Sequence, residues 1–180
     1  MIFPYHIALC VAEDLLSEIS PFCLRSEIVG SLRRGRPNVH DIDLLAVPTI
    51  LRLSNQEKIG SLLPRNLLDL KISRICQDGW CSVEATPPGH RRLLRREDDD
   101  ELTVDLYIAT EETWWTKLLV MTGSRVHNIG LALRAKELGL VLRPDGNGLE
   151  RPDGSLVPVE SEEDIFRALR LPFRPPQWRE

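Results

Sequence analysis

The feature that most constrains this chain is a pair of aspartates at the start of an apolar run. Asp41 and Asp43 open the stretch "DIDLLAV" (41–47), which predicts a buried strand closed by Pro48. Residues two apart on a strand point to the same face, so we expect the two carboxylates to stand side by side. Carboxylates are rarely buried unless they are paired or bound to a metal ion.

A third carboxylate lies on a later strand. The stretch "LTVDLYIA" (102–109) alternates, with Asp105 on the face opposite its apolar residues. If the two strands are adjacent, three carboxylates converge. Two of them about 4 Å apart repel by about 4 kcal/mol at an effective dielectric constant of 20, so such a cluster needs protons or a cation. Oxygen ligands suit magnesium or manganese. Aspartates exposed at strand ends are the alternative for a lone Asp-x-Asp pair.

The turn before the aspartates has the composition of an anion site. The strand "RSEIV" (25–29) runs into Gly30 and Ser31, and a short helix follows. Backbone N–H groups at such a turn can point at a phosphate, and Arg34 can bind the same oxygens with two hydrogen bonds. No Gly-Lys-Ser or Gly-Lys-Thr follows, so the turn is not a P-loop. The anion turn and the acidic cluster together indicate a metal–triphosphate site.

These motifs resemble one known family. The stretches "VGSLRRGRPNVHDIDLL", "VDLY" and "TGSRVHNIGLALRAKELG", followed by "DGSLVPVESEEDIFRALRLPFRPPQWRE", occur in the order found in the DNA polymerase β family, or family X, of the nucleotidyltransferase superfamily. The resemblance covers residues 25–180 and is weak between 50 and 100. Because no lyase or helix-hairpin-helix domain fits before residue 25, it implies a minimal form with the palm and the C-terminal lobe.

The resemblance also implies roles for individual residues. Asp41 and Asp43 would bind both metal ions, and Asp105 would bind the catalytic one. The expected nucleotide-binding residues are Gly30, Ser31, Arg34, His40, Val120, Met121, Gly123, Ser124 and Asn128. The family often has a Tyr-Phe pair where this chain has Val120 and Met121. We therefore expect this chain to accept ribonucleotides, in addition to deoxynucleotides, more readily than members with that pair.

The apolar periodicity predicts an α+β fold in two parts. We expect a catalytic palm over 1–110, with a mixed or antiparallel sheet and flanking helices, and a nucleotide-binding lobe with helices and a β-hairpin over 111–180. The predicted strands are 25–29, 41–47, 66–75, 79–85, 91–96 and 102–109. The predicted helices are 5–19, 54–63, 111–121, 124–138 and a short last one that Ser161 begins.

Composition limits the partners. The formal net charge of -4 argues against tight binding of nucleic acid by bulk electrostatics, although arginines cluster at 33–36 and 91–96. No apolar run is long enough to span a bilayer, and no secretory signal is evident. The four cysteines form no CxxC pair, which favours reduced thiols over a zinc site. We therefore expect a cytoplasmic monomer that binds no membrane.

The reaction expected from these observations is two-metal nucleotidyl transfer with Mg²⁺ or Mn²⁺. The expected substrates are a deoxynucleoside triphosphate and a primer-template or gapped DNA, in gap filling or repair of low processivity. Two alternatives stay open. One is a nucleotidyltransferase with an acceptor other than DNA, and the other is a non-catalytic module that binds DNA ends.

Overall fold

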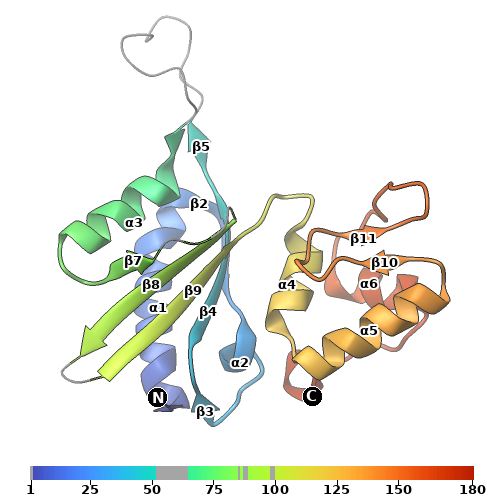
Figure 1. Ribbon diagram of the computed structural model, residues 1–180, viewed down its shortest axis with the longest axis horizontal. Coiled ribbons are helices and arrows are strands. Elements are labelled where there is room, and N and C mark those ends of the chain that lie inside the picture. Colours follow the sequence, from blue (N-terminus) through green and yellow to red (C-terminus); the bar gives the residue numbers. More distant parts are fainter. Residues whose placement is uncertain (1, 52–64, 85, 87–88, 98–99) are drawn as a thin grey trace, which may run out of the picture.

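The computed structural model describes residues 2–51, 65–84, 86, 89–97 and 100–180. A five-stranded sheet with the order β2-β4-β9-β8-β7 forms its centre (Figure 1). The strands are β2 (Cys23–Ile28), β4 (Ile42–Pro48), β7 (Ser82–Glu84), β8 (His90–Glu97) and β9 (Asp100–Ile108). Strands β4 and β9 run parallel, and the other neighbours run antiparallel. The sheet is therefore mixed, and the predicted α+β fold is confirmed.

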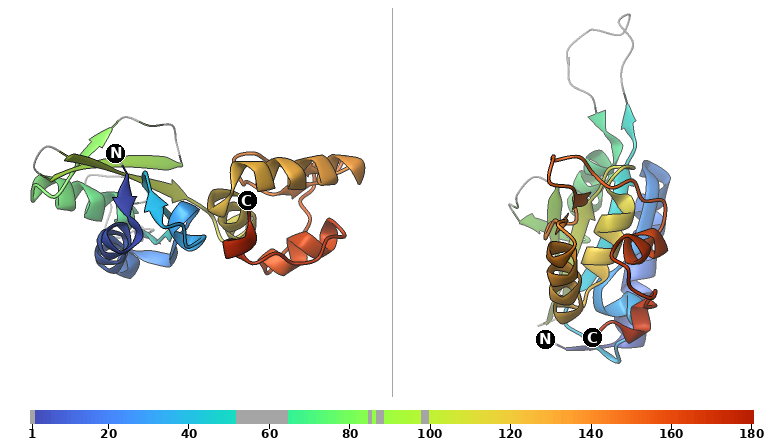
Figure 2. Two further views of the ribbon diagram at one scale, coloured as in Figure 1. Left: turned by 90° about the horizontal axis from the view of Figure 1, so that it is seen from below. Right: turned by 90° about the vertical axis from the view of Figure 1, so that its right-hand side faces the viewer.

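Two helices cover one face of this sheet. They are α1 (Tyr5–Ile19), with the bounds predicted from its apolar stripe, and α3 (Leu67–Gln77). Figure 2 shows both helices on the same side of the strands. Their apolar side chains form one buried cluster with alternate residues of the two central strands, including Ile42, Leu44, Val104 and Leu106. The residues between these, Asp43 and Asp105 among them, therefore face away from α1 and α3.

The opposite face packs against the rest of the chain. Leu45 and Val47 of β4 form a buried cluster with Trp114 and Leu118 of α4 (Trp114–Thr122). This contact places the start of α4 beside the face of the sheet that carries the aspartates. The predicted division at residue 110 stays a prediction, because this cluster includes residues from both sides of it.

The C-terminal residues have an apolar core of their own. It is built from α4, α5 (Arg125–Glu137), α6 (Glu162–Ala168) and the hairpin of β10 (Val141–Leu142) and β11 (Leu149–Glu150). Ser161 caps α6 by accepting a hydrogen bond from the Asp164 N–H. Gly139 follows α5 with a φ of 73°, a left-handed conformation that suits glycine after a helix. Both helix ends agree with the sequence pattern.

One predicted strand is a helix. Residues 66–75 were expected as a strand, but they contribute most of α3. The Asn66 side chain accepts hydrogen bonds from the N–H groups of Leu68 and Asp69, which satisfies two donors at the helix start. Leu68, Ile72 and Ile75 are buried at helical spacing. The predicted helix 54–63 lies outside the described residues.

Shorter elements complete the fold. They are β1 (Phe3–Pro4), η1 (Ser20–Phe22), α2 (Gly30–Arg33), β3 (Asn38–Val39), β5 (Ile50–Leu51), β6 (Arg65–Asn66) and η2 (Pro176–Trp178). Strand β1 pairs with β3, and β5 pairs with β6. In the described ranges, no helix has both the length and the apolar character needed to cross a membrane.

A buried ion network joins the two parts of the chain. Arg33 of α2 donates to both carboxylate oxygens of Glu162, at 3.0 and 2.8 Å. Arg179 donates to the same carboxylate at 2.6 Å, and its side chain is fully buried. Burial alone would raise the pKa of Glu162, but the two arginines outweigh it and hold that pKa below its usual value. The network therefore ties α2, beside the sheet, to α6 and the C-terminal segment.

Candidate metal centre and adjoining cavity

Three carboxylates meet on the face of the sheet that α1 and α3 leave uncovered. The parallel register of β4 and β9 places Asp43 opposite Asp105, and Asp41 directly precedes β4. One oxygen from each of the three carboxylates lies within 4.8 Å of the others. The convergence expected from adjacent strands is therefore present. Such a set of oxygen donors suits a hard divalent cation.

The electrostatics of this cluster favour a cation. The pKa of Asp43 is raised to about 7, first by burial and then by the negative charges of Asp41 and Asp105. The Tyr107 hydroxyl, which donates a hydrogen bond to Asp43, and the charge of Arg34 oppose this rise. Near neutral pH the cluster thus takes up a proton when no cation neutralises it. The residues fit a divalent ion, since the ion would supply the charge that the proton otherwise provides.

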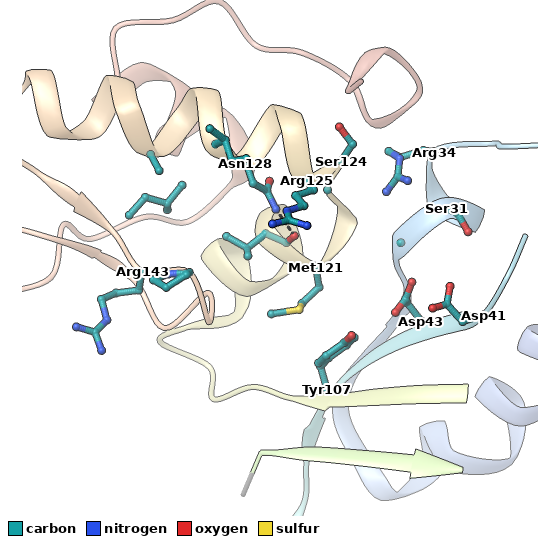
Figure 3. A pocket seen from close by; sticks show the side chains of 17 residues that line it. Ser31, Arg34, Asp41, Asp43, Tyr107, Met121, Ser124, Arg125, Asn128 and Arg143 are labelled. Atoms are coloured by element: carbon teal, nitrogen blue, oxygen red, sulfur yellow. Dashed lines mark hydrogen bonds between the residues drawn. The ribbon is translucent and has the colours of Figure 1, made fainter. Parts of the chain in front are cut away.

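A cavity of about 520 Å³ adjoins Asp41 and Asp43. Figure 3 shows these two carboxylates with Ser31 and Arg34 on one side of it, and Met121, Arg125 and Asn128 on the other. The cavity thus lies between the sheet with α2 and the first turns of α5. Of the predicted nucleotide-binding residues, it is lined by Gly30, Ser31, Arg34, Val120, Met121, Gly123, Ser124 and Asn128.

The α2 side of the cavity carries polar groups without partners. Ser31 Oγ and Arg34 Nε are buried, and neither has a hydrogen-bond partner among the described residues. Arg34 also donates through Nη1 to the Thr122 carbonyl at the end of α4. Buried polar groups are normally paired, so unpaired donors beside a cavity indicate a place for an oxygen-rich ligand.

The α5 side carries an unpaired acceptor. Asn128 donates through Nδ2 to the Val120 carbonyl at 2.7 Å, while its Oδ1 is buried without a partner in the described part of the chain. Ser124 caps α5 by accepting from the His127 N–H. The hydrogen bond to Val120 fixes the Asn128 amide, so its carbonyl oxygen is available to a ligand in the cavity.

Predicted residue His40 is not part of this wall. It is exposed and does not line the cavity that Asp41 lines. The structure therefore does not bring His40 to the expected place beside the nucleotide site.

Several residues of the site were not expected from the sequence. Tyr107, Arg125 and Arg143 line the cavity. Asp105, which is 4% exposed, is held by Arg92 and His90 of β8. The register of the hairpin could have indicated the contact of Arg92, because Arg92 precedes the turn by as many residues as Asp105 follows it. His90 lies two residues before Arg92 and therefore shares its face of the sheet. Within the arginine cluster at 91–96, Arg91 pairs with Asp69 and Arg92 pairs with Asp105.

Comparison with known proteins agrees with the resemblance. The family model described as DNA polymerase beta thumb matches residues 117–180. The DNA polymerase/3'-5' exonuclease PolX of Bacillus subtilis (strain 168) is 30% identical over 182 residues, which are 99% of this chain and 28% of that protein. DNA polymerase lambda of Rattus norvegicus is 26% identical over 171 residues, which are 84% of this chain and 28% of that protein.

The chain thus spans little more than a quarter of the length of these relatives, 28% in each case. The match to PolX extends over almost the whole chain and therefore includes the sheet that carries Asp41, Asp43 and Asp105. The thumb match begins within α4 and extends through the C-terminal segment. On these grounds the chain is homologous to the DNA polymerases of family X, the DNA polymerase β family.

Proposed function

We propose that this chain contains the nucleotidyl-transfer site of a DNA polymerase, which adds a deoxynucleotide to the 3′-hydroxyl of a primer. Both relatives are named as DNA polymerases, which supports this class of reaction. The observation that carries the proposal is the juxtaposition in one place of three carboxylates and a cavity with unpaired polar groups.

In this proposal, one group of residues would bind the metal ion and another would bind the phosphates of the nucleotide. Asp41, Asp43 and Asp105 would hold Mg²⁺ or Mn²⁺. When bound, such ions neutralise the triphosphate and lower the pKa of the attacking hydroxyl. Ser31 and Arg34 would bind phosphate oxygens with the donors that the structure leaves unpaired. This arrangement positions the phosphate chain next to the carboxylates.

The other wall of the cavity would receive the sugar and base. Val120 and Met121 lie there, and Asn128 presents its free Oδ1. An acceptor held in this way can accept one hydrogen bond from a base edge. The absence of an aromatic pair at 120 and 121 supports acceptance of ribonucleotides as well as deoxynucleotides.

The two relatives, both named as DNA polymerases, support a DNA substrate. A gap-filling or repair role with low processivity fits the net charge of -4, since few basic residues would contact phosphates. Monomeric state and a cytoplasmic location remain predictions.

Primer extension on gapped DNA tests the proposal. We expect Asp105→Asn to lower the extension rate to less than a hundredth of the wild-type rate, because the third carboxylate is lost. Triphosphate binding should persist, because Asp41 and Asp43 remain. The matched control is Asp78→Asn, a change at an exposed carboxylate away from the site, and it should extend primers at the wild-type rate.

Two results would contradict the proposal. Extension by Asp105→Asn at more than a hundredth of the wild-type rate would remove Asp105 from the site. A wild-type chain that extends no primer, but binds DNA ends or transfers a nucleotide to another acceptor, would favour one of the two alternative functions.

A further inference from the structure

Two side chains of β8 hold the third carboxylate. His90 Nε2 lies 2.7 Å from Asp105 Oδ1, and Arg92 Nε donates to the same oxygen at 2.8 Å. Arg92 Nη2 donates to Oδ2 at 3.2 Å. Each carboxylate oxygen carries two lone pairs. Both lone pairs of Oδ1 are therefore engaged, whereas Oδ2 keeps one for another ligand.

The strand register explains why these two residues reach Asp105. Arg92 lies opposite Asp105 across the antiparallel pair, and His90 lies opposite Tyr107. Residues two apart share a face, so all four side chains lie on the side of the sheet that carries the site. Arg91, between them, points the other way and pairs with Asp69 of α3. The contact is therefore specific to two positions of β8.

His90 is also linked, through Tyr107, to a second carboxylate, Asp43. The His90 ring stacks on Tyr107, with ring centroids 5.0 Å apart and an interplanar angle of 10°. The Tyr107 hydroxyl donates to Asp43. His90 thus contacts Asp105 directly and supports the side chain that binds Asp43. Two of the three carboxylates, Asp43 and Asp105, are therefore supported by one connected set of side chains.

We propose that His90 and Arg92 are positioning residues that fix the Asp105 carboxylate with Oδ2 as its metal-binding oxygen. This inference rests on the proposed function, in which Asp105 is a metal ligand. Without these two side chains, a carboxylate that is 4% exposed would lie beside two others with no side-chain hydrogen bond from the described part of the chain to hold its orientation. Outer partners of metal ligands typically change metal affinity by about 10- to 100-fold.

Binding of Mn²⁺ in the absence of nucleotide and DNA tests this role. Free Mn²⁺ is measured by electron paramagnetic resonance during titration of the whole chain. The difference in Mn²⁺ affinity between the wild type and Asp105→Asn first gives the part of the binding that depends on Asp105. We expect Arg92→Ala and His90→Ala each to weaken that part by about tenfold or more. Arg91→Ala is the matched control on the same strand and should bind Mn²⁺ like the wild type.

A conservative change separates positioning from packing. His90→Gln can place an amide N–H near the position of Nε2, so we expect it to recover most of the affinity that His90→Ala loses. A merely structural role would give the two variants similar affinities. Thermal unfolding of each variant identifies any that does not fold, and the His90 pair tests the inference independently of Arg92.

The outcomes distinguish this inference from the function on which it rests. If Asp105→Asn binds Mn²⁺ like the wild type, the proposed metal site fails. If Asp105→Asn weakens binding but Arg92→Ala and His90→Ala do not, only the positioning role is overturned. Tighter binding by Arg92→Ala would also overturn it, because the guanidinium would then compete with the ion.

Discussion

Gly30 sets how closely the start of α2 approaches the carboxylates. Its φ of +60° is in the left-handed region, and a Cβ atom placed there would lie 1.9 Å from Asp43 Oδ2. A side chain at this position would therefore displace the carboxylate as well as strain the backbone. Gly30, in the proposed anion turn, thus lies directly against Asp43, a proposed metal ligand, so a side chain added at Gly30 would disturb both.

The acidity of Asp43 leads to a prediction about stability. Its pKa is about 7 in the folded chain, against 3.8 as the ordinary value. Because the folded state keeps a proton that the unfolded state releases, the contribution of Asp43 to the free energy of unfolding of the metal-free protein should fall as pH rises from about 4 to about 7. We expect Asp43→Asn to lose most of this pH dependence and to be more stable than the wild type at pH 8.

Urea unfolding in the presence of a chelator, from pH 4 to pH 8, measures the effect. Asp78→Asn changes an exposed carboxylate and should keep the wild-type slope. Equal slopes for the wild type and Asp43→Asn would show that Asp43 does not take up the proton.

The sequence predicts the acidic residues of the site better than their supports. Asp41, Asp43 and Asp105 stand out because carboxylates interrupt apolar strands. Arg92 and His90 do not stand out, since basic residues on a hairpin are common and their role depends on a cross-strand register. His40 follows the converse pattern: it was expected in the nucleotide site because it adjoins Asp41 in sequence, yet it is exposed and does not line the cavity.

Among the elements, α3 was the least predictable from local pattern. Its residues 66–75 combine β-branched and apolar side chains, which favour a strand in isolation. Packing against α1 and the sheet favours the helix, because only helical spacing places Leu68, Ile72 and Ile75 on one buried face. Elements with a cap in the expected place were predicted closely: α5 was expected over 124–138, and Ser161 was expected to begin the helix that is α6.

The cap of α3 yields a second stability prediction. Asn66 Oδ1 accepts hydrogen bonds from Leu68 N at 3.0 Å and Asp69 N at 3.3 Å. We expect Asn66→Ala to lower the free energy of unfolding by about 1 kcal/mol, as measured by urea unfolding. Asn66→Ser should retain most of the stability because serine also caps helices.

An exposed asparagine provides the control for this change. Asn38 lies in the short strand β3, and Asn38→Ala should alter stability by less than about 0.5 kcal/mol. If Asn66→Ala has as small an effect as Asn38→Ala, the cap does not stabilise α3.

Across the whole molecule, the Arg33–Glu162–Arg179 network is the polar counterpart of the apolar contact between the two parts. Removing one member of a buried ion pair leaves the remaining charge without compensation and typically costs about 3–5 kcal/mol. We therefore expect Glu162→Gln to lower the free energy of unfolding by about 3 kcal/mol or more. Two buried or half-buried guanidinium groups would then lack their shared carboxylate.

The neighbouring residue Glu163 serves as the comparison, because it lies on the same helix and is exposed. Glu163→Gln should change the stability by less than about 0.5 kcal/mol. Similar losses for the two variants in urea unfolding would mean that the buried network contributes little to holding the parts together.

The parallel pairing of β4 with β9 determines when, during folding, the three carboxylates come together. Strand β2 and strand β4 pair across a short connection, whereas β9 joins them only after α3, β7 and β8 have intervened in the chain. Contacts of such separation carry a larger entropic cost of loop closure and slow the folding of a sheet. A half-assembled sheet of β2 and β4 carries Asp41 and Asp43 without Asp105. An incompletely folded chain would thus lack the proposed metal site, which would be complete only after β9 has joined the sheet.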